Sequence, residues 1–228
     1  MKVVAIIQAR MNSSRLPGKV LLPLSGKTVL GHLIERLEYS RIINQIVVAT
    51  SIEISDNLIA EYCKNNNINC YRGDLEDVLD RYYQTAKTYH ADVIVRITGD
   101  CPLIDPVVVD SVITGYLSGN YDFYGLSGKF PDGLDCTVFS ISSIAKASRE
   151  AKLQSEREHV GPYIENNPHL FRNGKIEIFD DLESYRWTLD ELADYKLLSK
   201  IFNELYRLNS PFLTHEVLQL MKDRPELR

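Results

Sequence analysis

The residues best suited to chemistry stand in one short stretch that follows the first apolar run. Gln8-Ala9-Arg10-Met11-Asn12-Ser13-Ser14-Arg15-Leu16-Pro17-Gly18-Lys19 carries three positive charges, at Arg10, Arg15 and Lys19, together with small polar residues and a glycine. Cations and backbone N–H groups that converge in one loop suit a polyphosphate. The stretch matches neither GxxxxGK[ST] nor GxGxxG. Because the chain has a net charge of −5, three clustered cations favour a phosphate site over an incidental solvated loop.

Two aspartates that follow apolar runs are candidate metal ligands. Asp100 lies in Thr98-Gly99-Asp100-Cys101-Pro102, and Asp190 ends Trp187-Thr188-Leu189-Asp190. Each alone reads equally well as a turn or helix-capping residue. If Asp100 and Asp190 meet in space, they form a two-carboxylate site suited to Mg²⁺, which commonly binds one or two carboxylates plus substrate phosphates.

Two further stretches mix charged and aromatic residues and are candidates for substrate contacts. The first is Pro131-Asp132-Gly133-Leu134-Asp135, and the second is Ser155-Glu156-Arg157-Glu158-His159-Val160-Gly161-Pro162-Tyr163. A lone histidine is more often structural than catalytic. Here Arg157 and Glu158 stand beside His159, which keeps a substrate-binding role open.

The first half of the chain alternates strand and helix patterns. Strands are predicted at 3–7, 46–50, 69–72 and 93–97. Helices are predicted with Thr28, Ser55 and Asp105 as caps, the last with Pro106 in its first turn, and over 74–89. This alternation predicts parallel pairing with right-handed crossovers. Ligands in such sheets bind beyond the carboxyl ends of the strands, here after residues 7, 50 and 97.

The second half is less regular. Residues 119–135 are rich in Gly, Tyr, Asp and Pro and predict a loop. Strands are expected at 137–140, 176–179 and 186–189, and helices at 143–152, 155–166 and about 191–207, with Asp190 able to cap the last. We expect one domain over 1–228, with an inserted lobe around 119–180.

Composition excludes several classes of protein. Of the 228 residues, 44% are apolar and 25% are charged, as in an ordinary globular domain. The acidic balance argues against duplex nucleic acid as a partner. No apolar run reaches the roughly 20 residues that span a bilayer, and the N-terminus does not read as a signal peptide, so we expect a cytoplasmic protein with no membrane contact. The four cysteines lack metal-site spacing and are expected to be reduced thiols.

The combination of motifs resembles a known family. Ile6-Ile7-Gln8-Ala9-Arg10, followed by Ser13, Arg15 and Leu16-Pro17-Gly18-Lys19, is similar to the signature of cytidylyltransferases that activate sugar acids, such as the acylneuraminate and 3-deoxy-manno-octulosonate enzymes. The spore coat polysaccharide biosynthesis proteins of that superfamily look most similar. GDCPLIDP at 99–106, PDGLD at 131–135 and REHV at 157–160 follow in the same order.

The chain also departs from the family pattern. Gln8 replaces a common proline, Thr137 stands where an acidic residue is expected, and the segment 187–191 matches a valine-aspartate-threonine pattern only loosely. These departures leave the sugar substrate open.

The resemblance implies a fold and an activity. The fold would be a nucleotide-diphospho-sugar transferase-like α/β three-layer sandwich with a mostly parallel central sheet. The inserted lobe would contribute to a homodimer interface and to the sugar site. The activity would be transfer of CMP from CTP to a sugar acid, with release of pyrophosphate, in surface polysaccharide biosynthesis. Mg²⁺ would be the cofactor.

The resemblance also implies roles for residues. Arg10, Lys19, Asp100 and Asp190 would be catalytic, with Asp100 and Asp190 holding the metal. Nucleotide contacts would come from Gln8, Ala9, Arg10, Ser13, Arg15, Lys19, Thr50, Ser51, Thr98 and Asp100. Acceptor contacts would come from Asp132, Asp135, Arg157, Glu158 and His159.

Three other functions compete with this one. The same fold can transfer another nucleotide to a sugar phosphate. A glycosyltransferase that uses a nucleotide sugar has a related sheet, although many carry an Asp-x-Asp motif, which does not occur in this sequence. A non-catalytic nucleotide-binding protein would bind CTP without releasing pyrophosphate.

Overall fold

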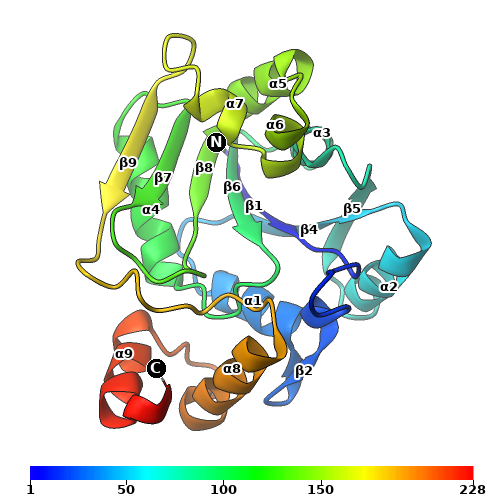
Figure 1. The fold of residues 1–228 in the computed structure, drawn as a ribbon. Helices are drawn as coiled ribbons and strands as arrows, with labels where there is room; N and C mark the ends of the chain where they lie inside the picture. The colour runs from blue at the N-terminus through cyan, green and yellow to red at the C-terminus, as the bar shows by residue number, and fades with distance from the viewer. Residues whose placement is uncertain (228) are drawn as a thin grey trace.

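A seven-stranded sheet forms the centre of the molecule in the computed structural model, which describes residues 1–227 (Figure 1). The strand order is β5-β4-β1-β6-β8-β7-β9. The strands are β1 (Val3–Gln8), β4 (Gln45–Ser51), β5 (Asn69–Gly73), β6 (Val93–Thr98), β7 (Phe123–Ser127), β8 (Thr137–Ser140) and β9 (Asn173–Glu177). Among the described strands of this sheet, β8 alone runs against its neighbours.

The first four predicted strands and their parallel pairing are confirmed. β1 lies between β4 and β6 and pairs in parallel with both. Its residues Val3 to Ile7 are all buried, because helices cover both faces of the sheet. A parallel strand buried on both faces reads as a continuous apolar run, which is why these strands could be predicted.

Helices on the two faces of the sheet make the outer layers. One face is covered by α1 (Val29–Glu38), α2 (Asn57–Asn65) and α4 (Pro106–Ser118). The other is covered by α3 (Val78–Thr88), α5 (Ile141–Glu150) and α7 (Pro162–Glu165), and α6 (Gln154–His159) packs against α3 and α7. Each face has its own apolar core, so the predicted α/β fold class is confirmed.

The C-terminal helices form a third apolar cluster. α8 (Leu192–Leu205) and α9 (Thr214–Asp223) pack together beside the small hairpin of β2 (Pro23–Leu24) and β3 (Lys27–Thr28), as the orange, red and blue segments at the bottom of Figure 1 show. Short 3₁₀ turns occur at η1 (Lys19–Leu21), η2 (Ile54–Asp56) and η3 (Pro225–Leu227).

Two buried charges fasten these C-terminal helices to the end of β6. Arg36 donates to the carbonyls of Ile104 (2.7 Å) and Phe212 (2.8 Å). Asp105 accepts from the backbone N–H groups at the start of α4, as its predicted capping role requires, and also from the N–H and hydroxyl of Thr214 at 2.8 and 2.7 Å. The C-terminal segment is thereby held close to the loop that contains Asp100.

Several predictions about the second half were wrong. Residues 119–135 do not form one loop, because Phe123–Ser127 is β7, paired with β8 and β9. The segment 186–189 is not a strand; the bridge between Asp132 and Arg186 is isolated, and Trp187 to Leu189 are buried by α8 and α9 instead. The predicted helix at 155–166 is interrupted at Val160, whose φ is 70°.

Smaller differences concern helix and strand ends. Ser55 does not cap a helix, since α2 begins only at Asn57 after a 3₁₀ turn. α3 begins at Val78, four residues later than predicted, where the Asp77 side chain caps it. α5 and β9 start two and three residues earlier than predicted. Helix α9 was not predicted.

Residues 119–180 contribute β7, β8 and β9 to the main sheet and α5, α6 and α7 to one face. The single domain with a substrate and dimerisation lobe stays a prediction. Within residues 1–227, the helices are all too short or too polar to cross a membrane.

We predict that Asp105→Ala lowers the free energy of unfolding by about 2–4 kcal/mol. The variant loses the cap of α4 and leaves the buried donors of Thr214 without an acceptor. Urea unfolding measures the loss. Asp223→Ala, at an exposed position on α9, should change stability by less than about 0.5 kcal/mol. Equal losses in the two variants would contradict the tethering role of Asp105.

Candidate active site

A polar pocket of about 200 Å³ lies beyond the carboxyl ends of β1 and β6. It is lined by Gln8, Ala9, Arg10, Ser13, Ser14, Arg15, Lys19, Val20, Thr98, Gly99, Asp100 and Asp190. The structure therefore brings the predicted basic loop and both predicted aspartates into one place. This is the location that parallel sheet topology favours for ligands.

The basic loop is folded back on itself and tied to the neighbouring strand. The N–H groups of Ser13 and Gly18 donate to the Met11 carbonyl at 3.0 and 2.8 Å, and Gly18 takes the left-handed conformation with φ 74°. The buried carboxylate of Asp56 accepts from the N–H of Met11 (2.7 Å) and from the N–H of Ser51 (3.1 Å). Asp56 thus joins the loop to the end of β4, a role that the sequence did not reveal.

Lys19 is the central cation of the pocket. Its Nζ lies 2.7 Å from Asp100 Oδ2 and 2.9 Å from Asp190 Oδ1, and its side chain is almost fully buried. Burial acts to lower the pKa of Lys19, but the charges and hydrogen bonds of Asp100 and Asp190 outweigh burial and raise that pKa. Lys19 is therefore positively charged and holds the two carboxylates together.

Asp190 binds two further cations. Its Oδ2 lies 2.9 Å from Arg15 Nη2 and 2.6 Å from Arg186 Nη2. Burial would raise the pKa of Asp190, yet hydrogen bonds from Lys19 and Arg186, together with the charges of Lys19 and Arg15, lower that pKa to about 2. Asp190 is thus an anion throughout the physiological pH range.

The backbone around Asp190 is held by a different aspartate. The carboxylate of Asp194 accepts from the N–H groups of Asp190 and Glu191, both at 2.8 Å, and the Leu189 N–H donates to the Asp100 carbonyl at 2.8 Å. The prediction that Asp190 caps α8 was therefore wrong. Glu191 is the N-cap residue of α8, and the Asp190 side chain lies in the pocket, where it binds Lys19.

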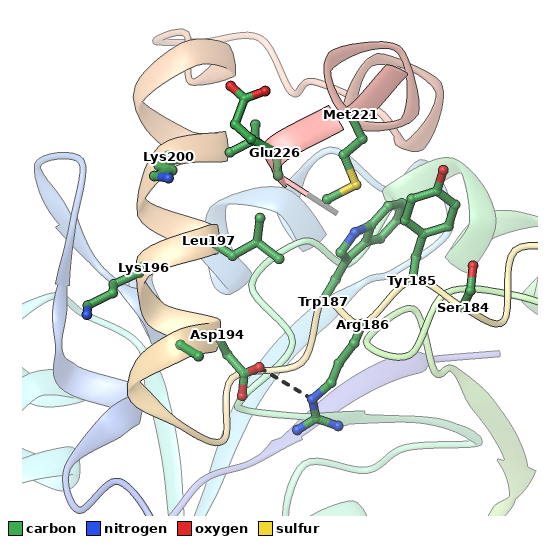
Figure 2. Close-up of a pocket in the computed structure, with 12 residues that line it drawn as sticks. Ser184, Tyr185, Arg186, Trp187, Asp194, Lys196, Leu197, Lys200, Met221 and Glu226 are labelled. Carbon is green, nitrogen blue, oxygen red and sulfur yellow. Dashed lines mark hydrogen bonds and ion pairs between the residues drawn. The ribbon is translucent and has the colours of Figure 1, made fainter. Parts of the chain in front are cut away.

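Arg186 is a site residue that the sequence did not indicate. Besides Asp190, its guanidinium contacts Asp132 (2.8 Å) and Asp194 (3.4 Å). Figure 2 shows the contact with Asp194, where Arg186 borders a cavity of about 570 Å³ under Trp187 and α8. In the sequence, only the spacing of four residues between Arg186 and Asp190 could have suggested that the two side chains form an ion pair.

Asp132 and Asp135 lie near this network. Asp132 is linked to Asp190 through Arg186, and the Asp135 carboxylate accepts from the Gly133 N–H at 3.2 Å. Burial and the charge of Asp135 raise the pKa of Asp132, while Arg186 opposes the rise.

Two predicted nucleotide contacts lie outside the pocket lining. Thr50 and Ser51 are fully buried at the end of β4, and the Ser51 hydroxyl donates to Asp56. Their part in nucleotide binding stays a prediction.

The structure does not bring the predicted acceptor residues of the 157–159 segment to the pocket. Arg157 forms an ion pair with Asp77 and donates to the carbonyls of Ser148 (2.9 Å) and Ala151 (3.1 Å), so it fastens α6 to α3 and α5. Glu158 is partly exposed and His159 is exposed on the same short helix.

The carboxylates of Asp100 and Asp190 fit a hard cation, because they already converge on one ammonium group. Over residues 1–227, no group of three or more His, Cys, Asp or Glu side chains could hold a metal ion by itself. Two protein carboxylates completed by substrate phosphates are a usual arrangement for Mg²⁺. The four cysteines are free thiols.

Fold and site together define a nucleotide-binding transferase, with a basic loop after β1 and an aspartate after β6. The cytidylyltransferase family model matches residues 4–210, and the chain belongs to that family. The protein is a CTP-dependent nucleotidyltransferase.

Known proteins share much of the chain. The spore coat polysaccharide biosynthesis protein SpsF of Bacillus subtilis is 33% identical over 210 residues, which cover 89% of this chain and 87% of SpsF. The 3-deoxy-manno-octulosonate cytidylyltransferase of Trichlorobacter lovleyi is 35% identical over 90% of this chain and 82% of its own length. The structure of a cytidylyltransferase from Leptospira borgpetersenii matches with a TM-score of 0.93 and 35% identity, covering 100% of this chain and 96% of the other.

We predict a pH-dependent effect of Asp190→Asn on stability in EDTA. Because the folded-state pKa of Asp190 lies below its ordinary value, the charged form stabilises the protein above about pH 4, and this contribution is lost as pH falls toward 2. The variant should unfold at lower urea concentration than the wild type at pH 7, and the difference should shrink between pH 4 and 2. A difference that stays constant over this range would contradict the assigned pKa.

Proposed function

We propose that this cytidylyltransferase transfers CMP from CTP to the hydroxyl of a sugar acid and releases pyrophosphate, in the biosynthesis of a surface polysaccharide. The observation that carries the proposal is the convergence of Lys19, Asp100 and Asp190 in a pocket bounded by the basic loop. The names of the Bacillus and Trichlorobacter relatives support the acceptor class and the pathway.

The basic loop supplies the charges that a triphosphate needs. Arg10 lines the pocket and makes no hydrogen bond or ion pair with any other residue in 1–227, so its guanidinium is available to a phosphate. The Arg15 side chain is exposed and forms ion pairs with Asp190 and Glu191. Arg10, Arg15 and Lys19 would bind the β- and γ-phosphates and neutralise the charge that develops on the leaving pyrophosphate.

Asp100 and Asp190 would hold Mg²⁺ together with the nucleotide. When bound there, Mg²⁺ supplies positive charge beside the α-phosphate and lowers the pKa of the acceptor hydroxyl. Arg186 and Asp194 keep Asp190 oriented, and the Leu189–Asp100 hydrogen bond keeps the two loops in register.

The reaction would proceed by attack of the acceptor hydroxyl on the α-phosphorus, in line with the departing pyrophosphate. The P–O bond to the acceptor forms as the bond to the β-phosphate oxygen breaks. Catalysis would consist mainly of positioning and charge neutralisation by the loop cations. The lobe around 119–180 is the predicted homodimer contact in this proposal.

A thermal-shift titration with CTP, UTP, GTP and ATP, each with and without Mg²⁺, tests nucleotide use. A ligand that binds the native state raises the unfolding midpoint, so the pattern reports relative affinity. We expect a CTP-selective shift that Mg²⁺ enlarges, and pyrophosphate release when a sugar acid is added. A shift with UTP or GTP alone would overturn the proposal.

We predict that Asp100→Asn lowers Mg²⁺-dependent turnover by about 100-fold or more, since one metal ligand loses its charge. The part of the CTP thermal shift that requires Mg²⁺ should disappear, while the part seen without Mg²⁺ should remain. Asp223→Asn, on the exposed side of α9, is the matched control and should behave as the wild type. Near-normal Mg²⁺-dependent turnover in Asp100→Asn would remove Asp100 from the mechanism.

A further inference from the structure

Arg96 is a charged residue in the middle of an apolar sheet face. It lies on β6, level with Ile6 of β1 and Thr137 of β8. Since side chains alternate along a strand, Arg96 shares its face with Ile94, two residues earlier, which belongs to the core beneath α3, α5 and α7. A guanidinium at such a position costs desolvation energy and therefore calls for a partner.

The structure gives Arg96 no such partner. Its side chain makes no hydrogen bond or ion pair with the other residues of 1–227, and its Nε is buried without an acceptor. The other arginines that are buried or half-buried in this part of the chain, Arg36, Arg72, Arg81 and Arg157, each donate to at least one carbonyl or carboxylate. Burial raises the pKa of Glu165 on α7 and the charge of Arg96 opposes this rise, but the two side chains form no ion pair.

Two more unpaired polar atoms lie on the same corner of the sheet. They are Gln8 Oε1 on β1 and Thr137 Oγ1 on β8, both buried without a hydrogen-bond partner. Gln8 is level with Thr98, and both line the polar pocket. Arg96 precedes Thr98 by two residues, which places it about 6–7 Å back along the strand from the pocket lining.

Most of the other cations are already paired with carboxylates, and Arg10, the unpaired cation of the pocket, lies in the loop proposed to bind the triphosphate. Arg157 binds Asp77, Arg186 contacts three carboxylates, and Lys19 bridges Asp100 and Asp190. A carboxylate that approached Arg186 or Lys19 would compete with protein carboxylates. A carboxylate that approached Arg96 would meet a cation that forms no ion pair within residues 1–227, although the Glu165 carboxylate is near enough to interact with its charge.

We propose that Arg96, with Gln8 and Thr137, forms the subsite that binds the carboxylate end of the acceptor. This inference rests on the proposed function and assigns to Arg96 the part that sequence alone gave to Arg157 and His159. The guanidinium donates to the carboxylate, the Thr137 hydroxyl adds a donor, and Gln8 Oε1 accepts from a neighbouring sugar hydroxyl. The subsite selects acids over neutral sugars.

The test uses the guanidinium N–H signals of the full chain labelled with ¹⁵N-arginine. The probes are 3-deoxy-manno-octulosonate, N-acetylneuraminate and the methyl ester of each, added to protein saturated with CTP in EDTA so that no transfer takes place. Loss of one signal in Arg96→Lys assigns it to Arg96. We expect at least one acid, and not its ester, to move this signal.

Kinetics with the acid that binds complete the test. Arg96→Met should raise the KM for that acid about 10–100-fold and leave the KM for CTP unchanged, because one charge-assisted hydrogen-bonding group is lost. Arg96→Lys should recover part of the affinity. Arg41→Met, at an exposed position before β4, should leave both KM values unchanged. As Arg96 has no protein partner, we expect Arg96→Met to melt no lower than the wild type.

Each contrary result is decisive. No movement of the Arg96 signal with any of the acids, equal movement with acid and ester, or an unchanged KM for the acid in Arg96→Met overturns the subsite. The CTP thermal shift decides the proposed function separately. A shift with CTP but no response of Arg96 removes only the subsite, whereas a response of Arg96 without any CTP shift removes the nucleotidyl transfer and keeps the subsite.

Discussion

The ammonium group of Lys19 between Asp100 and Asp190 is the interaction on which the rest of the site depends. It joins Lys19 to Asp100, 81 residues later in the chain, and to Asp190, 171 residues later. Two carboxylates close enough to bind the same ammonium group repel each other unless a cation lies between them. The fold supplies that cation from the loop after β1, and it supplies the two anions from the ends of β6 and of the segment that enters α8. Arg15 and Arg186 add positive charge around Asp190, so the polar pocket is electrically compensated before any ligand enters.

The strands that could be predicted most directly are those whose two faces are both buried. The strands β1, β4 and β6 are mostly apolar because both faces of the sheet are covered, although β6 includes Arg96, and their parallel order follows from the helices between them. This topology also predicted where the basic loop and Asp100 would lie. β7 was missed because it mixes Gly125 and Ser127 with aromatic residues, and its pairing with β9 joins segments about fifty residues apart. Trp187 to Leu189 have the composition of a strand but are buried by helices, which no local pattern distinguishes.

The site residues divide in the same way. Arg10, Arg15 and Lys19 were recognised because they are clustered in sequence. Arg186 was missed because only the folded structure shows that its guanidinium binds three carboxylates. Two belong to Asp190 and Asp194, four and eight residues later, and the third belongs to the distant Asp132. Arg157 was predicted as a substrate contact because of its charged neighbours, but in the folded chain it forms an ion pair with Asp77. Arg96 has an ordinary place in a strand pattern, and only the folded structure shows that its side chain has no partner and that its Nε is buried.

These two electrostatic environments imply different consequences for the two substrates. A metal–nucleotide complex that enters the polar pocket exchanges one set of ion pairs for another, since Lys19, Arg15 and Arg186 already neutralise the aspartates. The net gain from such an exchange is small relative to the gross interaction, because each new contact of Lys19, Arg15 or Arg186 replaces an old one, whereas Arg10 is free to add a contact. A carboxylate that reaches Arg96 removes no existing pair and also relieves a buried donor that lacks an acceptor. In the proposed reaction, the selectivity for an acid would then reside in Arg96, while the compensated cluster around Lys19 would position the phosphates for transfer.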